Sequence, residues 1–152
     1  MDPSYIEENA ERLRRMRALV GRLDDDALRA PVNEHWSVAG ILGHIAFWDA
    51  RVIALADKLE RGESFTPSDE EPEDPGWIND AARPLIHAVP PDELAALALQ
   101  LAEETDRRVA SIPPDRMWPR DAGSPLNPWR AGHRGEHLDE IEAVLERRAP
   151  RT

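Results

Sequence analysis

The segment from residue 37 to residue 61 constrains the fold most, because its apolar side chains recur at the spacing of one helix face. Ser37 can cap such a helix at its start, and Gly62 can end it. The recurrence follows steps of three and four residues and comprises Ile41, His44, Trp48, Val52 and Leu55. We therefore predict a long helix here, with a histidine on its inner face.

Three further long helices are predicted over residues 4–23, 92–111 and 129–148. The first ends at a solvated turn of three aspartates, Asp24-Asp25-Asp26, and its inner face comprises Ile6, Ala10, Leu13, Met16 or Arg17, and Val20. The next begins at Asp92 as its cap, and its apolar side comprises Leu94, Leu97, Leu101 and Val109. The last has a stripe spaced by four that comprises Trp129, His133, His137, Ile141 and Leu145.

Two long loops separate these helices. Residues 63–75 hold six acids, three prolines and no base, and such a segment cannot bury enough surface to fold by itself. We expect this loop to be either a lid over a site or a flexible insertion. A short helix over residues 77–87, broken near Pro84, follows it, and residues 113–128 form a second, proline-rich loop.

The composition favours a single all-α domain over residues 1–152, because strand-forming runs are few. Thirty acids against 19 bases give a net charge of −11, which repels nucleic acid and anionic membranes. The absence of cysteine excludes disulfides, thiolate ligands and a cysteine nucleophile. The start is charged rather than apolar, and no run of about 18 apolar residues occurs, so we expect a cytoplasmic protein.

Three of the five histidines can converge on one point. His133 and His137 lie one turn apart on one helix face, and His44 faces inward from another helix, so three imidazoles could reach one divalent ion. The alternative is that each is a buried histidine with its own hydrogen-bond partner. His35 and His87 are expected in loop or surface positions.

The residues around these histidines resemble those of the DinB-like superfamily, over nearly the whole chain. The resemblance rests on Trp36-Ser37 before a helix that carries His44 in Gly-His-Ile-Ala-Phe-Trp-Asp, and on His133-Arg-Gly-Glu-His137 near the C-terminus. It implies an up-down-down-up four-helix bundle, a divalent ion held by His44, His133 and His137, and a homodimer formed through helix faces. The superfamily includes YfiT-type hydrolases and the metal-binding domain of mycothiol-dependent maleylpyruvate isomerase.

Three hypotheses for the activity remain open, each with a small molecule as the ligand. The resemblance implies an enzyme that activates a low-molecular-weight thiol on zinc or nickel, for which Arg51, Arg130 and Arg134 are candidate anchors. A metal hydroxide could instead hydrolyse its substrate, with Glu136 or Asp49 as the proton acceptor. The third possibility is a metal-stabilised binding module without catalysis.

The C-terminal motif also allows other interpretations. His133-Arg-Gly-Glu-His137 matches the inverted zinc-protease signature, but only 15 residues follow it, too few for the downstream helix which that signature needs. A ferritin-like di-metal site would need Glu-x-x-His pairs, and the sequence has none. Glu136 could accept a hydrogen bond from an imidazole, act as a base or face solvent. Trp48 and Trp129 could line the cavity or fill the core.

Overall fold

The structure is a computed structural model that describes residues 3–117 and 124–150. Within these residues the chain forms seven α-helices and one 3₁₀ helix, η1, without a β-strand, so the prediction of an all-α protein is confirmed. The elements are α1 (Tyr5–Val20), α2 (Asp25–Arg29), α3 (Val38–Glu60), η1 (Pro67–Asp69), α4 (Gly76–His87), α5 (Pro91–Ser111), α6 (Pro114–Met117) and α7 (Ala131–Arg148).

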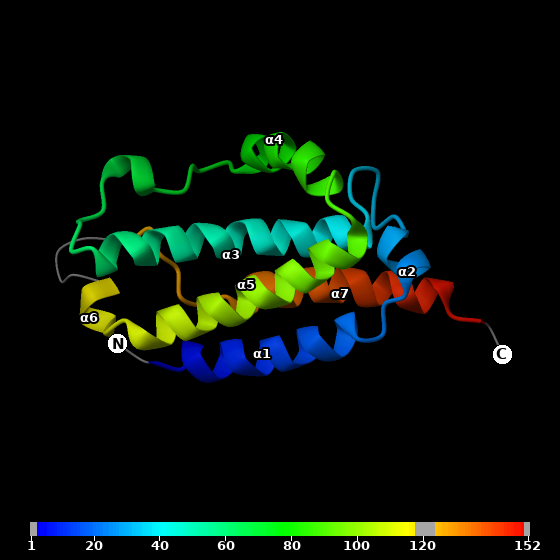
Figure 1. Cartoon of the computed structure of the whole chain (residues 1–152), viewed down its shortest axis with the longest axis horizontal. Helices are drawn as coiled ribbons and strands as arrows, with labels where there is room; N and C mark the ends of the chain where they lie inside the picture. The colour runs from blue at the N-terminus through cyan, green and yellow to red at the C-terminus, as the bar shows by residue number, and fades with distance from the viewer. Residues whose placement is uncertain (1–2, 118–123, 151–152) are drawn as a thin grey trace.

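Four long helices, α1, α3, α5 and α7, lie side by side (Figure 1). α1 and α7 run in one direction along the molecule, and α3 and α5 run in the other. α3 contacts α2, α4, α5 and α7, so the fold is organised around it. α4 lies on the outer side of α3 and is reached through the long loop that contains η1.

The predicted long helix is confirmed in α3. The Ser37 side chain accepts a hydrogen bond from the Gly40 amide at its N-terminus, and every residue of the predicted inner face is buried. α3 is also long and apolar enough to cross a membrane, with a mean hydropathy of 1.5, but 72% of that stretch is buried inside the fold. Packing against the other helices therefore accounts for its apolar character.

The N-terminal region differs from the prediction in two ways. The aspartates after α1 do not form a solvated turn, because the Asp24 carboxylate caps α2 by accepting from the Ala27 amide. Ile6 is 42% exposed, and Asn9 occupies the interior in its place. Asn9 is satisfied there by three backbone partners, the carbonyl of Pro128 and the amides of Arg130 and Ala131.

The middle helices also depart from expectation. α4 continues through Pro84 without a break, because the carbonyl that loses its partner belongs to the exposed residue 80, where water can replace it. α5 begins at Pro91, with Pro90 in the N-cap position and no side-chain capping bond, while Asp92 lies in the first turn instead of capping the helix. Leu97 is 39% exposed, because α5 packs on α3 through a face of smaller side chains that includes Ala95, Ala98 and Ala102.

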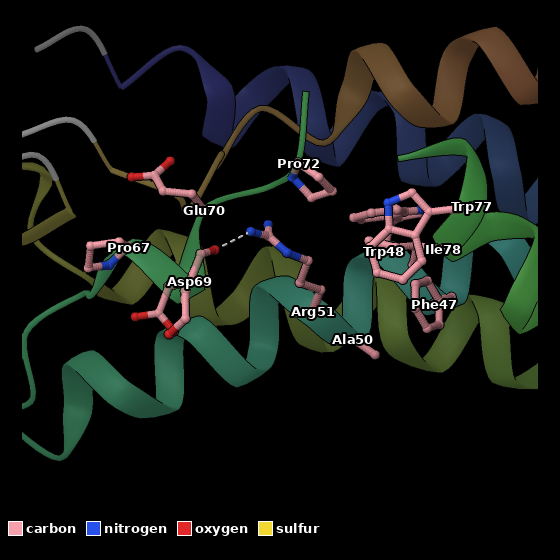
Figure 2. Close-up of a pocket in the computed structure, with 11 residues that line it drawn as sticks. Phe47, Trp48, Ala50, Arg51, Pro67, Asp69, Glu70, Pro72, Trp77 and Ile78 are labelled. Atoms are coloured by element: carbon pink, nitrogen blue, oxygen red, sulfur yellow. Dashed lines mark hydrogen bonds between the residues drawn. The ribbon is translucent and has the colours of Figure 1, made fainter. Parts of the chain in front are cut away.

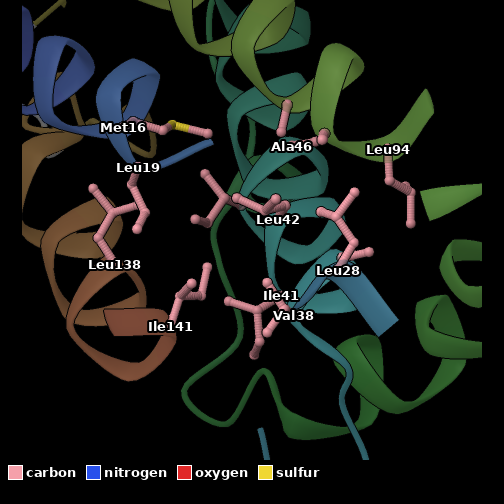
Figure 3. Close-up of a cluster of buried hydrophobic side chains, with 14 of the residues drawn as sticks. Met16, Leu19, Leu28, Val38, Ile41, Leu42, Ala46, Leu94, Leu138 and Ile141 are labelled. Carbon is pink, nitrogen blue, oxygen red and sulfur yellow. The ribbon is translucent and has the colours of Figure 1, made fainter. Parts of the chain in front are cut away.

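Two hydrophobic clusters fill the interior. The larger one, shown in Figure 3, surrounds residues 38–46 of α3 and receives Met16 and Leu19 from α1 and Leu138 and Ile141 from α7. The smaller one surrounds residues 52–59 of α3 and includes Tyr5, Val109, Met117 and Leu126. On α7, Ile141 of the predicted stripe is fully buried, and so are Arg134 and Leu138, which were not in the stripe. The other stripe residues, Trp129, His133, His137 and Leu145, are half-buried.

A layer of buried polar side chains separates the two clusters, and we call it the Asp49 layer. The fully buried Asp49 carboxylate accepts from Arg130 Nε at 2.9 Å and contacts Arg134 Nη2 at 3.2 Å. Arg134 also contacts Asp106 of α5 at 2.8 Å, and the Thr105 hydroxyl donates to the Asp49 carbonyl at 3.3 Å. These contacts fix the positions of α3, α5 and α7 along one another.

We expect the Asp49→Asn variant to lose about 3 kcal/mol or more of stability, because two buried arginines would lose their shared negative charge. Urea unfolding of the metal-free protein measures this loss. The matched control is Asp139→Asn, which removes a carboxylate that is 71% exposed and paired with Arg15. This control should lose less than about 1 kcal/mol, and equal losses in the two variants would contradict a structural role for the layer.

Candidate metal centre

The structure brings His44 of α3 together with His133 and His137 of α7. One ring nitrogen from each lies within 4.8 Å of the others, and the Nε2 atoms of His44 and His133 are 3.2 Å apart. The ring centroids are 4.7 to 5.2 Å apart. His44 is buried, and the other two are half-buried, so the cluster lies where the core meets a cavity.

This spacing fits a shared divalent ion. Two nitrogens bound to one tetrahedral zinc at about 2.0–2.1 Å lie about 3.3 Å apart, close to the separation between His44 and His133. His133 Nδ1 is buried and has no hydrogen-bond partner among the described residues, so the cluster is not explained as a set of separately satisfied histidines. The residues present therefore fit a three-histidine site.

Burial keeps two of these imidazoles neutral. Desolvation lowers the pKa of His44 to about 4 and that of His133 to about 2. The second-largest cause of the lowered pKa is, for both residues, repulsion from the charge that His137 would carry when protonated. For His133, the third-largest cause is the positive charge of Arg130. A metal-binding histidine must be neutral, so at pH 7 an ion does not have to displace a proton from either ring.

Glu140 orients His137. Its carboxylate oxygen lies 3.1 Å from His137 Nδ1, and because a carboxylate only accepts, the hydrogen on that ring belongs on Nδ1. This arrangement leaves Nε2 of His137 with a free lone pair. Glu136, the acid singled out in the sequence, lies on the exposed side of α7 and has no hydrogen bond to the three histidines among the described residues. The i, i+3 spacing from His137 is the signal that could have indicated Glu140.

The three histidines border a cavity of about 420 Å³. Its remaining wall comprises Trp48, Glu71, Pro75, Asn79, Asn127 and Arg130. A smaller hollow of about 230 Å³ shares His44, Asn79 and His137 with it. The acidic loop therefore supplies part of the wall through Glu71 and Pro75. The loop is held in place by an ion pair of 2.7 Å between Lys58 and Asp69.

The cavity presents hydrogen-bond donors that have no partner among residues 3–117 and 124–150. The Asn79 oxygen accepts from the Trp48 indole at 2.8 Å, and the Asn127 oxygen accepts from the Trp129 amide at 3.0 Å. Both side-chain amino groups are then left for a ligand. Arg130 uses its Nε for Asp49, and its terminal amino groups make no hydrogen bond to a described residue. These donors suit acceptor groups, including anionic ones, while the Glu71 carboxylate adds a negative charge to the same wall.

The other residues singled out in the sequence are used elsewhere. Arg51 donates to the carbonyls of Asp69 and Pro125, and Arg134 belongs to the Asp49 layer. Trp129 packs edge-on against Tyr5 with the ring centroids 5.4 Å apart, in the smaller cluster. His35 and His87 are exposed, as expected. No sequence pattern indicated Asn79 or Asn127, because their places in the cavity depend on how α4 and the loop before α7 pack against the histidines.

We expect the Glu140→Gln variant to bind zinc about 10- to 100-fold more weakly, because the carboxylate that orients His137 is replaced by a neutral amide. Competition with a chromogenic chelator measures the affinity. Glu136→Gln makes the same substitution on the exposed side of α7 and should leave the affinity unchanged. An equal loss in both variants, or a loss only for Glu136→Gln, would contradict this assignment.

The comparisons with known proteins agree with this geometry. The model of the DinB superfamily matches residues 9–145, which include all three histidines and all four long helices in large part. Neither the curated proteins nor the solved structures that were compared gave a match. A family match over this share of the sequence, together with the all-helical fold, shows that the chain belongs to the DinB superfamily.

Proposed function

We propose that this protein is a metal-dependent enzyme that activates a low-molecular-weight thiol for transfer to a small electrophile. The hydrogen-bond donors around the three histidines are the observation that supports this proposal most. Arg130, Asn79 and Asn127 line the cavity with donors that no described residue uses, while Asp49 and Glu140 are already engaged. A nucleophile that brings its own negative charge suits such a cavity.

The ion would be held by His44, His133 and His137, and zinc or nickel suits three imidazole ligands. Once bound, it would stabilise the thiolate form of the thiol at neutral pH. Arg130 and the two asparagine amides would bind acceptor groups elsewhere on the thiol compound and fix its orientation. Trp48, itself held by Asn79, would keep water from one side of the cavity.

Hydrolysis is the second candidate, and one observation favours it. Glu71 lines the cavity from the acidic loop and could accept a proton there, whereas Asp49 is enclosed between two arginines and Glu136 is exposed outside the cavity. A non-catalytic module is less well supported, because a cavity with unused donors beside the histidines is a feature of a ligand site. The directions of the four long helices support the up-down-down-up bundle that the resemblance to the DinB-like superfamily implies.

The test uses protein loaded with Co²⁺, whose near-ultraviolet absorption rises when sulfur binds. We expect such a rise with 2-mercaptoethanol and with 3-mercaptopropionate, and none in the His133→Ala variant. The second thiol carries a carboxylate that can meet the Arg130 side of the cavity. It should bind about tenfold more tightly or better than the first, because hydrogen bonds to charged groups contribute about 1.5–3 kcal/mol.

The two candidate functions give different results. No absorption change with either thiol would contradict thiol activation. If the loaded protein then hydrolysed p-nitrophenyl acetate, and Glu71→Gln removed that activity while Glu73→Gln did not, hydrolysis would be the better account.

A further inference from the structure

We propose that a second pocket, between α3, the acidic loop and α4, binds an uncharged aromatic or aliphatic group of the electrophilic substrate. This inference rests on the proposed function, because the electrophile is the partner of the activated thiol. We call this site the Trp77 pocket. Its principal walls are Phe47 and Trp48 of α3, Pro67 and Pro72 of the loop, and Trp77 and Ile78 of α4 (Figure 2).

The pocket has the size of a small-molecule site. Its volume of about 710 Å³ falls within the range of about 300–1,000 Å³ that is usual for ligand pockets. Its aromatic walls are also unusually open to solvent, since Trp77 is 65% exposed and Phe47 is 37% exposed. A smaller hollow of about 280 Å³ shares Phe47, Trp77 and Ile78 and extends the apolar surface along α4. These rigid aromatic groups offer a large contact area at a low cost in side-chain entropy.

The pocket adjoins the metal cavity. Trp48 lines both, and the acidic loop borders both, with Glu70 and Pro72 at the Trp77 pocket and Glu71 and Pro75 at the metal cavity. One loop therefore covers two adjacent sites that share the Trp48 side chain. An electrophile whose apolar part lies in the Trp77 pocket can place its reacting group on the side of Trp48 that faces the histidines.

The charges around the pocket favour an uncharged group. Arg51 lies over the Trp48 ring at 5.9 Å, and two of its amino groups already donate to the carbonyls of Asp69 and Pro125. The Asp69 carboxylate is paired with Lys58 at 2.7 Å. Arg51 keeps its positive charge beside these neutral carbonyls, and Glu70, which is exposed and has no hydrogen bond from a described residue, carries a negative charge. These two opposite charges offset each other, so the lining gives neither an anion nor a cation a net attraction, whereas its apolar walls favour an uncharged group.

Two fluorescent probes test this chemistry on metal-free protein. N-phenyl-1-naphthylamine is uncharged, and 8-anilino-1-naphthalenesulfonate has the same ring system with one negative charge. We expect the uncharged probe to bind about tenfold more tightly or better, which corresponds to about 1.4 kcal/mol. Equal or tighter binding of the sulfonate would overturn the assignment of an uncharged ligand.

A pair of matched variants tests the location. Ala50 lines the pocket from α3, so Ala50→Trp should fill it and weaken binding of N-phenyl-1-naphthylamine about tenfold or more. Ala54 lies one turn further along α3 at an exposed position that borders none of these cavities, and Ala54→Trp should leave binding unchanged within about twofold. If Ala50→Trp fails to fold, Trp77→Ala should weaken binding, whereas Trp77→Phe should largely retain it.

Three results would overturn the proposal. Binding that resists both Ala50→Trp and Trp77→Ala would place the probe elsewhere. Binding that appears only on dilution, as a dimer separates, would show that a second copy of the chain covers the pocket. Loss of binding in the metal-free His133→Ala variant would place the probe in the metal cavity. Because binding is measured without metal, failure of thiol activation would leave these results unaffected.

Discussion

The buried pairing of Asp49 with Arg130 and Arg134 is the interaction on which the rest of the structure depends. A carboxylate and two guanidinium groups removed from water are costly unless they meet one another, so their contacts fix how α7 lies against α3. The two arginines lie on either side of His133 in the chain. The register that satisfies Asp49 is therefore also the register that places His133 beside His44.

The Asp49 layer also divides the interior into regions with different roles. On one side, a large hydrophobic cluster holds the ends of α1, α3 and α7 together, and on the other a smaller cluster closes the opposite end. At the edge of the layer, Arg130 lines the cavity with its Nε fixed by Asp49, and its terminal amino groups make no hydrogen bond to a described residue. One residue thus connects the stability of the fold with the binding of a ligand, and a charged group is positioned before the ligand arrives.

The sequence predicted the parts of the fold that depend on local spacing. α3 was predictable because a cap, an inner face and a terminal glycine agree. Helix periodicity also predicted the inward face of His44 and the shared face of His133 and His137, whereas their meeting at one point depends on how α7 packs against α3. Asn9 was not predictable, because its partners lie about 120 residues away in the chain. The Asp49 layer, the exposed side of Leu97 and the donors from Asn79 and Asn127 likewise depend on which helices and loops meet, and hydrophobic periodicity does not encode that.

We propose that three imidazoles, held in place by this packing, bind one divalent ion. Elemental analysis by plasma mass spectrometry of untagged protein, purified without chelator, tests it directly. We expect about one transition metal per chain, and its loss in each of the variants His44→Ala, His133→Ala and His137→Ala, whereas His35→Ala, at an exposed histidine, should retain it. A protein that takes up no metal even after incubation with zinc and nickel, or that binds metal equally well without His133, would contradict the account.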